Sequence, residues 1–279
     1  MDQQERFIDI EKIIASKNPR LLKWLPGPVL RYIKRILHEA DVNKFMALHG
    51  NKKGIAFIHE VFREFDVRIE SQGVEHIPAQ GGCYIVGNHP LGGLDGLALI
   101  EGVYNQRRDI QFLVNDILLH LEPLQEFFVP VNKHGTQREA EKIEAAYRSE
   151  HAILIFPAGL VSRKQNGEVS DLEWKKSFVN KAVQYHQPIV PAFIEGANSP
   201  FFYNLALWRK RLGIKANIEM FYLVDEMYKQ KNKTIRIIFD RPVMSTHLDK
   251  SKSPREWARL FRDQVYAIRD QRPGPFTKQ

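Results

Sequence analysis

The chain has 279 residues but only one cysteine, Cys83, so no disulfide bridge can form within it. Free cysteine is among the most buried residue types, and Cys83 lies in an apolar run, so we expect a packed core thiol rather than a reactive one. Sparse cysteine is typical of proteins from a reducing compartment, which favours a cytoplasmic location.

Long hydrophobic runs are also missing. The sequence has no stretch of about 18 or more uncharged apolar residues, so no membrane-spanning helix is expected. Residues 1–20 are charged throughout and lack the apolar centre of a signal peptide. Internal repeats and long Gly/Ser linkers are absent too, and the chain is long enough for one sizeable core. These features favour a single domain with at most a small appendage.

Several motifs that define a catalytic or binding class are absent as well. There is no G-x-S-x-G, so a serine nucleophile on a strand-to-helix turn is not expected. The stretch "FIHEVFREF" (57–65) lacks the second histidine of the H-E-x-x-H zinc motif, and we expect no metal. Signatures of helix-turn-helix, zinc-finger and RNA-recognition modules are missing, so nucleic acid is not an expected partner.

What the chain does have is an excess of positive charge. Lys and Arg number 41 against 33 Asp and Glu, which gives a formal net charge of +8. A basic surface favours anionic partners, such as a membrane with acidic lipids or an acidic carrier protein. With 43% hydrophobic and 27% charged residues, the composition is otherwise that of a folded globular protein.

Residues 1–60 are predicted to form an N-terminal helical segment. In "PVLRYIKRILHEA" (28–40) apolar residues recur at helical spacing and basic residues take the other face, which indicates an amphipathic helix. Pro26-Gly27-Pro28 separates this helix from the apolar stretch before it. Between Arg20 and His38 there are five Lys or Arg residues and no acid. Such a helix suits contact with an anionic bilayer, although packing of its apolar face on the core fits the pattern equally well.

Residues 61–279 are predicted to form one α/β domain. Apolar runs typical of strands alternate with helical patterns, which indicates a largely parallel mixed sheet covered by helices on both faces. In such sheets, ligands bind just beyond the carboxyl ends of the strands. The expected strands are 67–71, 83–88, 111–115, 127–132, 152–157, 188–194 and 234–240, and the expected helices are 94–106, 136–150, 175–186 and 253–271, the last opened by Ser253 and Pro254.

The stretch "VGNHPLGGLDG" (86–96) carries reactive side chains at the end of one such strand. His89 follows the apolar run, and Asp95 comes six residues later, past Gly92-Gly93. Six residues turn an ideal helix by about 600°, so the two side chains can meet only across non-helical chain, for which glycine supplies the freedom. An aspartate bonded to one imidazole nitrogen leaves the other free as a general base. The alternative interpretation is a loop histidine beside an aspartate that caps a helix.

The same stretch resembles the first motif of the lysophospholipid (glycerophospholipid) acyltransferase superfamily, a histidine and an aspartate in a strand-to-helix loop. Blocks that resemble the later motifs follow in the family's order, and the likeness covers roughly residues 65–245. The resemblance implies an α/β acyltransferase in which His89 is the base and Asp95 orients it. The later blocks are "FFVPVNK" (127–133), "LIFPAGLVSR" (154–163), "IVPAFIEG" (189–196) and "IIFDRPV" (237–243).

These blocks depart from the family pattern where the acceptor is held. The spacer between His89 and Asp95 has five residues where four are usual, and Ala158 replaces the third-motif glutamate, giving F-P-A-G. Asn132-Lys133 stands where Asp-Arg is usual, and lysine meets a phosphate as a point charge without the fork of arginine. Two acceptors therefore stay open, a lysophosphatidate and a lyso-aminolipid. The resemblance implies that the substrate is bound by Asn132, Lys133, Phe156, Pro157, Gly159, Ser162, Arg163 and Lys164.

A second candidate for membrane contact is "FFYNLALWRKRLG" (201–213), which combines aromatic and aliphatic residues with cations. That combination suits an anionic bilayer surface. The residues that we expect to contact the membrane are Trp24, Leu30, Ile33 and Trp208.

Together these features predict a peripheral O-acyltransferase on the cytoplasmic, inner face of the cell membrane. His89 takes the proton from a lyso-lipid hydroxyl, whose oxygen attacks an acyl thioester of CoA or of acyl carrier protein. No cofactor or metal is expected. Two other classes stay open, an acyl-ester or thioester hydrolase in which His89 activates water, and a non-catalytic lipid-binding protein.

Overall fold

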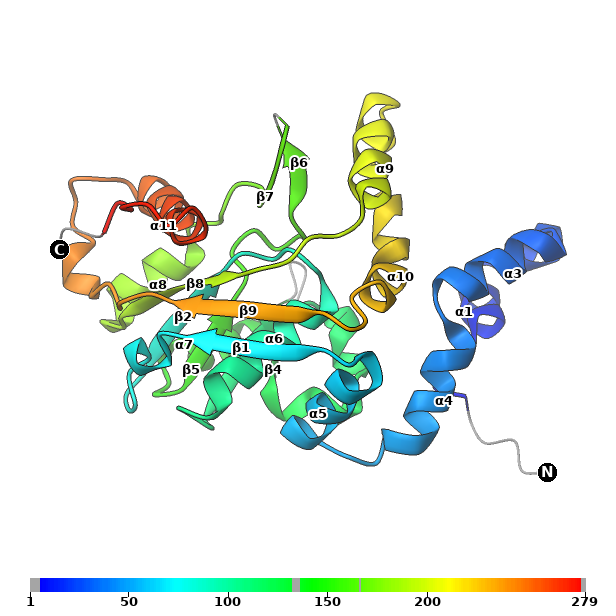
Figure 1. Cartoon of the computed structure of the whole chain (residues 1–279), viewed down its shortest axis with the longest axis horizontal. Coiled ribbons are helices and arrows are strands. Elements are labelled where there is room, and N and C mark those ends of the chain that lie inside the picture. Colours follow the sequence, from blue (N-terminus) through cyan, green and yellow to red (C-terminus); the bar gives the residue numbers. More distant parts are fainter. Residues whose placement is uncertain (1–5, 132–135, 166, 277–279) are drawn as a thin grey trace.

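The computed structural model describes residues 6–131, 136–165 and 167–276 as helices arranged around a mixed sheet (Figure 1). The helices are α1 (Ile10–Lys17), α2 (Pro19–Trp24), α3 (Gly27–Ile36), α4 (Glu39–His49), α5 (Gly54–Phe65), α6 (Gly93–Tyr104), α7 (Gln137–Arg148), α8 (Ser177–Tyr185), α9 (Pro200–Arg211), α10 (Leu223–Tyr228) and α11 (Pro254–Arg269). The strands are β1 (Arg68–Gln72), β2 (Cys83–Gly87), β3 (Ile110–Val114), β4 (Phe128–Pro130), β5 (Ala152–Ile155), β6 (Arg163–Gln165), β7 (Glu168–Ser170), β8 (Ile189–Ile194) and β9 (Thr234–Phe239). Short 3-10 helices used below are η3 (Glu122–Phe127) and η4 (Ile218–Tyr222).

The main sheet joins seven strands of the described chain in the order β1-β9-β8-β2-β5-β3-β4. Neighbouring strands run parallel except β8 and β9, which are antiparallel. The prediction of one α/β unit with a largely parallel mixed sheet is therefore confirmed. The central strand β2 lies between β8 and β5, and the loop that follows it carries His89.

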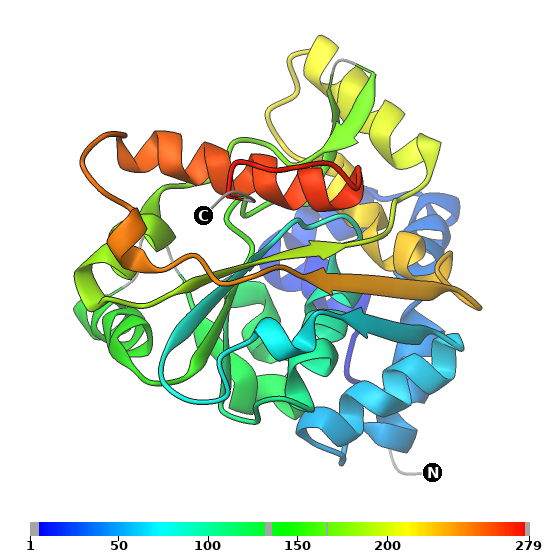
Figure 2. The same ribbon diagram turned by 60° about the vertical axis from the view of Figure 1, so that its left-hand side comes forward.

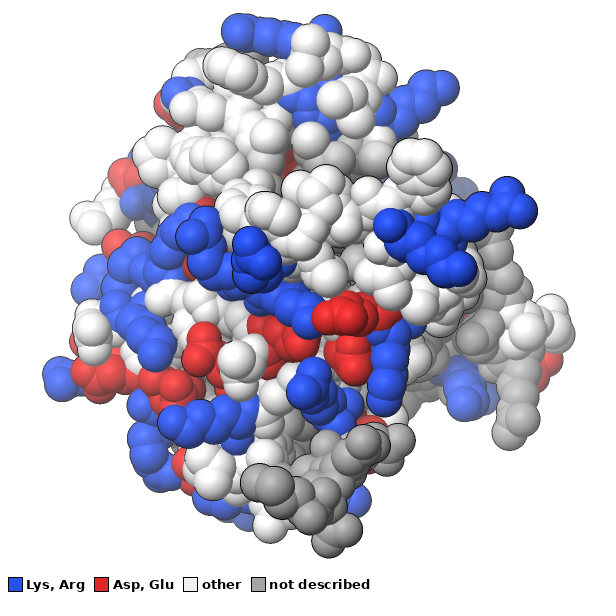
Figure 3. Space-filling view, turned by 90° about the vertical axis from the view of Figure 1, so that its right-hand side faces the viewer, with Lys and Arg blue, Asp and Glu red and all other residues white. Residues whose placement is uncertain are grey.

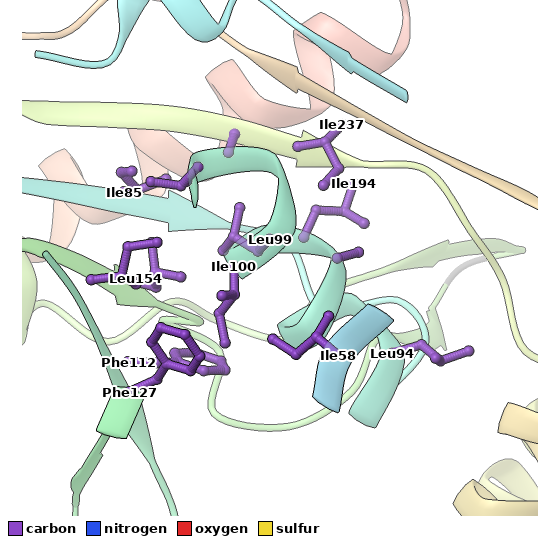
Figure 4. Close-up of a cluster of buried hydrophobic side chains, with 14 of the residues drawn as sticks. Ile58, Ile85, Leu94, Leu99, Ile100, Phe112, Phe127, Leu154, Ile194 and Ile237 are labelled. Atoms are coloured by element: carbon purple, nitrogen blue, oxygen red, sulfur yellow. The ribbon is translucent and has the colours of Figure 1, made fainter. Parts of the chain in front are cut away.

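Both faces of the sheet are covered, as the continuous apolar strands predict. Side chains alternate along β2, so Ile85 joins the cluster beneath α5 and α6, while Tyr84 and Val86 join the cluster beneath α8 and α11. Figure 2 shows α11 across one face, with α5 and α6 on the other. Figure 4 shows the first cluster, in which strand residues Ile85, Leu154 and Ile237 lie near Leu99 and Ile100 of α6. Cys83 is fully buried in the same cluster, as expected.

The N-terminal helices α1, α3 and α4 stand to one side of the sheet, next to α10 (Figure 1). The prediction of one helix over 28–40 is wrong at Leu37-His38, where α3 ends and α4 begins with His38 in the left-handed region at φ 49°. Tertiary contacts hold this break: the His38 ring stacks on Tyr228 at 3.7 Å, and its Nε2 lies 3.1 Å from Asp225 of α10.

Helix α5 belongs to the main core, because Phe57, Ile58 and Phe65 pack with α6 and η3. Residue 60, at which we expected the N-terminal segment to end, lies within this helix. Across residues 6–131, 136–165 and 167–276, no helix has both the length and the apolar character needed to cross a membrane.

Candidate active site

The carboxyl end of β2 is clamped to β8 before the chain reaches His89. Asn88, which is buried, donates from Nδ2 to the carbonyl of Ile194 (2.8 Å) and accepts from the Ile194 amide (2.7 Å). The side-chain amide thus replaces a pair of sheet hydrogen bonds and fixes the backbone beside His89. Sequence reasoning missed Asn88, because nothing local indicates a partner 106 residues away.

Asp95 caps α6 and also lies beside the ring of His89. Its carboxylate is fully buried and caps α6, because Oδ2 accepts from the amides of Leu91 (2.8 Å) and Gly92 (3.3 Å), and Oδ1 from that of Gly96 (3.1 Å). The same Oδ2 lies 3.1 Å from Nδ1 of His89, at ion-pair distance but without the alignment of a regular hydrogen bond. The capped loop therefore brings base and carboxylate together.

Gly92 makes the five-residue spacer possible. It has φ +95° and ψ −117°, a conformation that side-chain-bearing residues rarely adopt, and α6 begins at the next residue. The chain turns back at this point, so that His89 lies over the first turn of α6.

The His89 ring also packs against an aromatic side chain. It stacks on Phe156, with ring centroids 4.3 Å apart and an angle of 18° between the planes, and 18% of the side chain is exposed. Burial lowers the pKa of the imidazole, but the negative charges of Asp95 and Asp171 outweigh it and hold the pKa above its ordinary value of 6.5. Within the described residues, Nε2 has no hydrogen-bond partner, which leaves it available to a substrate.

A second buried carboxylate, Asp171, binds the backbone of the loop that carries His89. It accepts from the His89 amide (3.2 Å), from Oγ of Ser162 (2.6 Å) and from Nε1 of Trp174 (2.9 Å). Burial raises the pKa of the Asp171 carboxyl, while the bonds from Ser162 and Trp174 oppose that shift. No local pattern indicates this role, because Asp171 lies 82 residues from His89 in a polar stretch.

A cavity of about 780 Å³ opens beside His89, within the usual size range of small-molecule sites. Its wall is mostly apolar, and residues of α4, α5, α7, α8 and α10 contribute to it. The polar lining residues are His89, Glu64 of α5, Asn115, Lys175, Ser177 and Lys181. Lining residues include Phe45, Phe57, Phe112, Phe156, Tyr147 and Lys175.

Comparisons with known proteins bear on this site. A family model described as "Acyltransferase" matches residues 12–272, nearly the whole chain. The chain belongs to this acyltransferase family.

Two curated relatives are similar over almost their full length. A lyso-glycine lipid O-acyltransferase of Phocaeicola vulgatus is 44% identical over 267 residues, covering 94% of this chain and 95% of the relative. A protein of the same name from Bacteroides thetaiotaomicron is 42% identical over 266 residues, covering 94% and 97%. The crystal structure of the 1-acyl-sn-glycerophosphate acyltransferase PlsC from Thermotoga maritima is 16% identical, with a TM-score of 0.47 over 85% of this chain and 95% of that chain. The predicted membership of the lysophospholipid acyltransferase superfamily is confirmed.

The acyltransferase brings some of the expected substrate-binding residues to the cavity and keeps others away from it. Phe156, Pro157 and Gly159 line the cavity beside His89. Ser162 is buried and bonded to Asp171 and to the His89 carbonyl, so it fixes the loop rather than facing a ligand. Lys164 is exposed on β6 and does not line the cavity, and Asn132 and Lys133 lie outside the described residues.

Arg163 faces the interior of the acyltransferase, where burial lowers the pKa of its guanidinium. Its Nη2 donates to Oε1 of Glu219 (3.0 Å), and the guanidinium lies over the ring of Phe202. Arg209 holds the other side of Glu219, with Nε 2.8 Å from Oε2. The three charges join β6, α9 and η4, so we no longer assign Arg163 to the acceptor.

Ala158 is also buried, among apolar side chains of the cluster beneath α8 and α11. A glutamate at this position would bring an unpaired charge into that cluster, so Ala158→Glu would report on folding as well as on the acceptor. As for metals, no three His, Cys, Asp or Glu side chains gather into a possible ligand cluster in the part of the acyltransferase that the structure describes.

The raised pKa of His89 predicts the pH dependence of the acyltransferase. In the role of general base that we expect for it, His89 must be neutral, so kcat/KM should fall as the pH drops through a value above 6.5. Asp95→Asn removes the charge that favours the imidazolium, and its acidic limb should therefore move to lower pH while the plateau falls. Rate profiles of both proteins between pH 5 and about 9 test this. An acidic limb at the same pH in Asp95→Asn would show that another group titrates.

Proposed function

We propose that this acyltransferase moves an acyl group from a thioester to the free hydroxyl of a lyso-aminolipid, and specifically of a lyso-glycine lipid. The observation that carries the proposal is the His89–Asp95 pair, whose imidazole opens on a large and mostly apolar cavity. The names of the two relatives that match nearly the whole chain support the acceptor class.

The geometry supports a direct transfer. The acceptor hydroxyl donates its hydrogen to Nε2 of His89, and its oxygen attacks the thioester carbonyl as the proton moves to the imidazole. Asp95 keeps Nδ1 in place and stabilises the imidazolium. The tetrahedral intermediate then expels the thiolate, which takes the proton from Nε2. The products are an ester and the free thiol of CoA or of acyl carrier protein.

The chemistry of glycine determines where the acceptor hydroxyl must lie and which charge the head group carries. Glycine has no side-chain hydroxyl, so O-acylation of a glycine lipid requires a hydroxyl on the acyl chain that its nitrogen carries. The head group is then a free carboxylate with a single negative charge. A phosphate monoester, by comparison, carries about −1.5 to −2 at pH 7. The described lining of the cavity contains no arginine, the residue that best matches phosphate.

A competition assay tests the acceptor. The purified chain is given one labelled acyl thioester with N-(3-hydroxyacyl)glycine and lysophosphatidate at equal concentration. We expect the label mainly in the glycine lipid, with CoA and acyl-carrier-protein donors compared in parallel. Preference for lysophosphatidate by tenfold or more (about 1.4 kcal/mol) would refute the glycine lipid as acceptor.

We further propose that the protein binds the anionic inner face of the membrane through its N-terminal helices and α9. Trp24 of α2 is 85% exposed and Trp208 of α9 is 66% exposed. The helices α1, α3 and α9 lie on the same side of the molecule (Figure 1). Tyr32 of α3 meets Tyr222 through their hydroxyls at 2.9 Å, and Tyr222 packs on Phe201 of α9. Figure 3 shows that Lys and Arg flank uncharged surface on this side, with a group of acidic residues among the basic ones. Exposed aromatics with cations around them suit an anionic bilayer.

Replacing both Trp24 and Trp208 with glutamine should release the protein from vesicles that contain anionic lipid. Both indoles are exposed, so the far-UV spectrum should not change. Salt should weaken wild-type binding as well, since the Debye length falls from about 10 Å at 0.1 M to about 3 Å at 1 M. Co-sedimentation with vesicles measures both effects.

The matched control carries Val183→Gln and Met244→Gln, which change exposed apolar residues outside these helices. It should bind vesicles like the wild type. Equal loss of binding by the two double variants would contradict the proposed surface. Leu30 and Ile33, which we expected to contact lipid, are half-buried and are poorer probes because their replacement also disturbs packing.

A further inference from the structure

The cavity has a lysine that the catalytic mechanism leaves unused. Lys175 lines the cavity just before α8 and follows the buried Trp174. Its backbone amide donates to the carbonyl of Pro157 (3.1 Å), so the residue is attached to the turn that carries Phe156 and Gly159. Because Phe156 stacks on His89, this turn lies next to the base.

The ammonium of Lys175 has no acidic partner among the residues that the structure describes. The neighbouring cavity lysine, Lys181, forms an ion pair with Glu144 (2.7 Å), and Glu173 is held by Arg255. In the described ranges, Lys175 has no ion pair and no side-chain hydrogen bond. Lys175 is exposed and lines the cavity, so its ammonium is accessible to an anionic group on the ligand.

Gly159 leaves the space in which this ammonium lies. Its φ is +66°, and a Cβ atom added to it would come within 2.6 Å of Nζ of Lys175. The charge therefore sits against the glycine, on the wall that also holds Phe156 and Pro157.

We propose that Lys175 determines acceptor specificity by binding the carboxylate of the glycine head group. The inference rests on the proposed function and adds the residue that recognises the head group. One ammonium matches a head group with one negative charge, whereas a lysine meets a phosphate monoester only as a point charge, without the fork of arginine. The hydroxyl on the acyl chain then lies on the His89 side and the carboxylate on the Lys175 side of the same turn.

The test compares two acceptors of equal chain length, N-(3-hydroxyacyl)glycine and its neutral glycinamide. Lys175→Met keeps the length of the side chain and removes the charge. We expect it to raise KM for the acid about tenfold or more, in line with the loss of a charged hydrogen bond, and to leave KM for the amide within about twofold. The kcat values should change little. The matched control is Lys176→Met, an exposed neighbour that does not line the cavity and should behave like the wild type.

Each other outcome overturns the proposal. If Lys175→Met retains the wild-type preference for the acid, Lys175 does not bind the head group, although the proposed function stands. If KM rises equally for acid and amide, the residue acts on the structure of the site. If the wild type acylates neither acceptor, the proposed function fails and the role of Lys175 fails with it.

Discussion

Replacing His89 with alanine should lower the rate of acyl transfer by roughly 10²–10⁴-fold, the usual contribution of a general base. The His89 imidazole lines the cavity and has a nitrogen available to a substrate, and Asp95 lies beside its other nitrogen. Alanine also removes the stacking contact with Phe156, so the far-UV spectrum and the thermal midpoint of the variant must be recorded. Rates are measured with saturating donor and acceptor, so that the loss appears in kcat.

The control is His59→Ala, which removes an exposed histidine that is paired with Glu101 on a neighbouring helix. It should transfer acyl groups at the wild-type rate. Asp95→Asn should cost less than His89→Ala, because the base survives but loses its orientation. Near-native transfer by a folded His89→Ala variant would show that another group accepts the proton.

Replacing Glu219 with glutamine should lower the free energy of unfolding by about 3–5 kcal/mol, the usual cost of breaking a buried ion pair. Glu219 is fully buried, and the side chains of Arg163 and Arg209 on either side of it are only 9% and 16% exposed. Glutamine keeps the shape but leaves two buried cations facing each other. Urea unfolding, followed by fluorescence and by far-UV circular dichroism, measures the change in the free energy of unfolding.

Two control variants show whether the loss of stability comes from the buried cluster. Glu173→Gln breaks the exposed pair with Arg255 and should cost less than about 1 kcal/mol. The triple variant Arg163→Met, Arg209→Met and Glu219→Leu replaces the whole buried cluster and should recover most of the lost stability. A Glu219→Gln variant as stable as Glu173→Gln would contradict the structural role of the cluster, and with it our reassignment of Arg163.

The periodicity of the sequence predicted the sheet and its covering helices, because buried parallel strands and amphipathic helices have local patterns. The start of α11 also followed from local signals: Ser253 accepts from the Glu256 amide, and the Glu256 carboxylate reaches back to the Ser253 amide. The His89–Asp95 pair was accessible for the same reason, since one short loop contains both residues and the glycine that lets them meet.

What the sequence could not predict depends on distant contacts. Arg163 has the residue type of a phosphate ligand, but a glutamate 56 residues later binds it inside the protein. The break at His38 comes from its contacts with Asp225 and Tyr228, which outweigh the helical pattern of 28–40. Lys175 becomes notable only when its attachment to Pro157 and the pairing of Lys181 are known. In each case the deciding partner is remote in the chain.

The most direct test of the central claim is whether release of thiol from the donor depends on the acceptor. Wild-type protein is mixed with a labelled acyl thioester, first alone and then with N-(3-hydroxyacyl)glycine. In the proposed mechanism His89 activates the acceptor hydroxyl and no protein nucleophile takes part, so we predict no thiol release and no labelled protein before the acceptor is added. Afterwards, thiol and O-acylated lipid should appear in equal amounts. Thiol release without acceptor, or a covalently labelled protein, would contradict direct transfer by His89 and indicate hydrolysis or an acyl-enzyme.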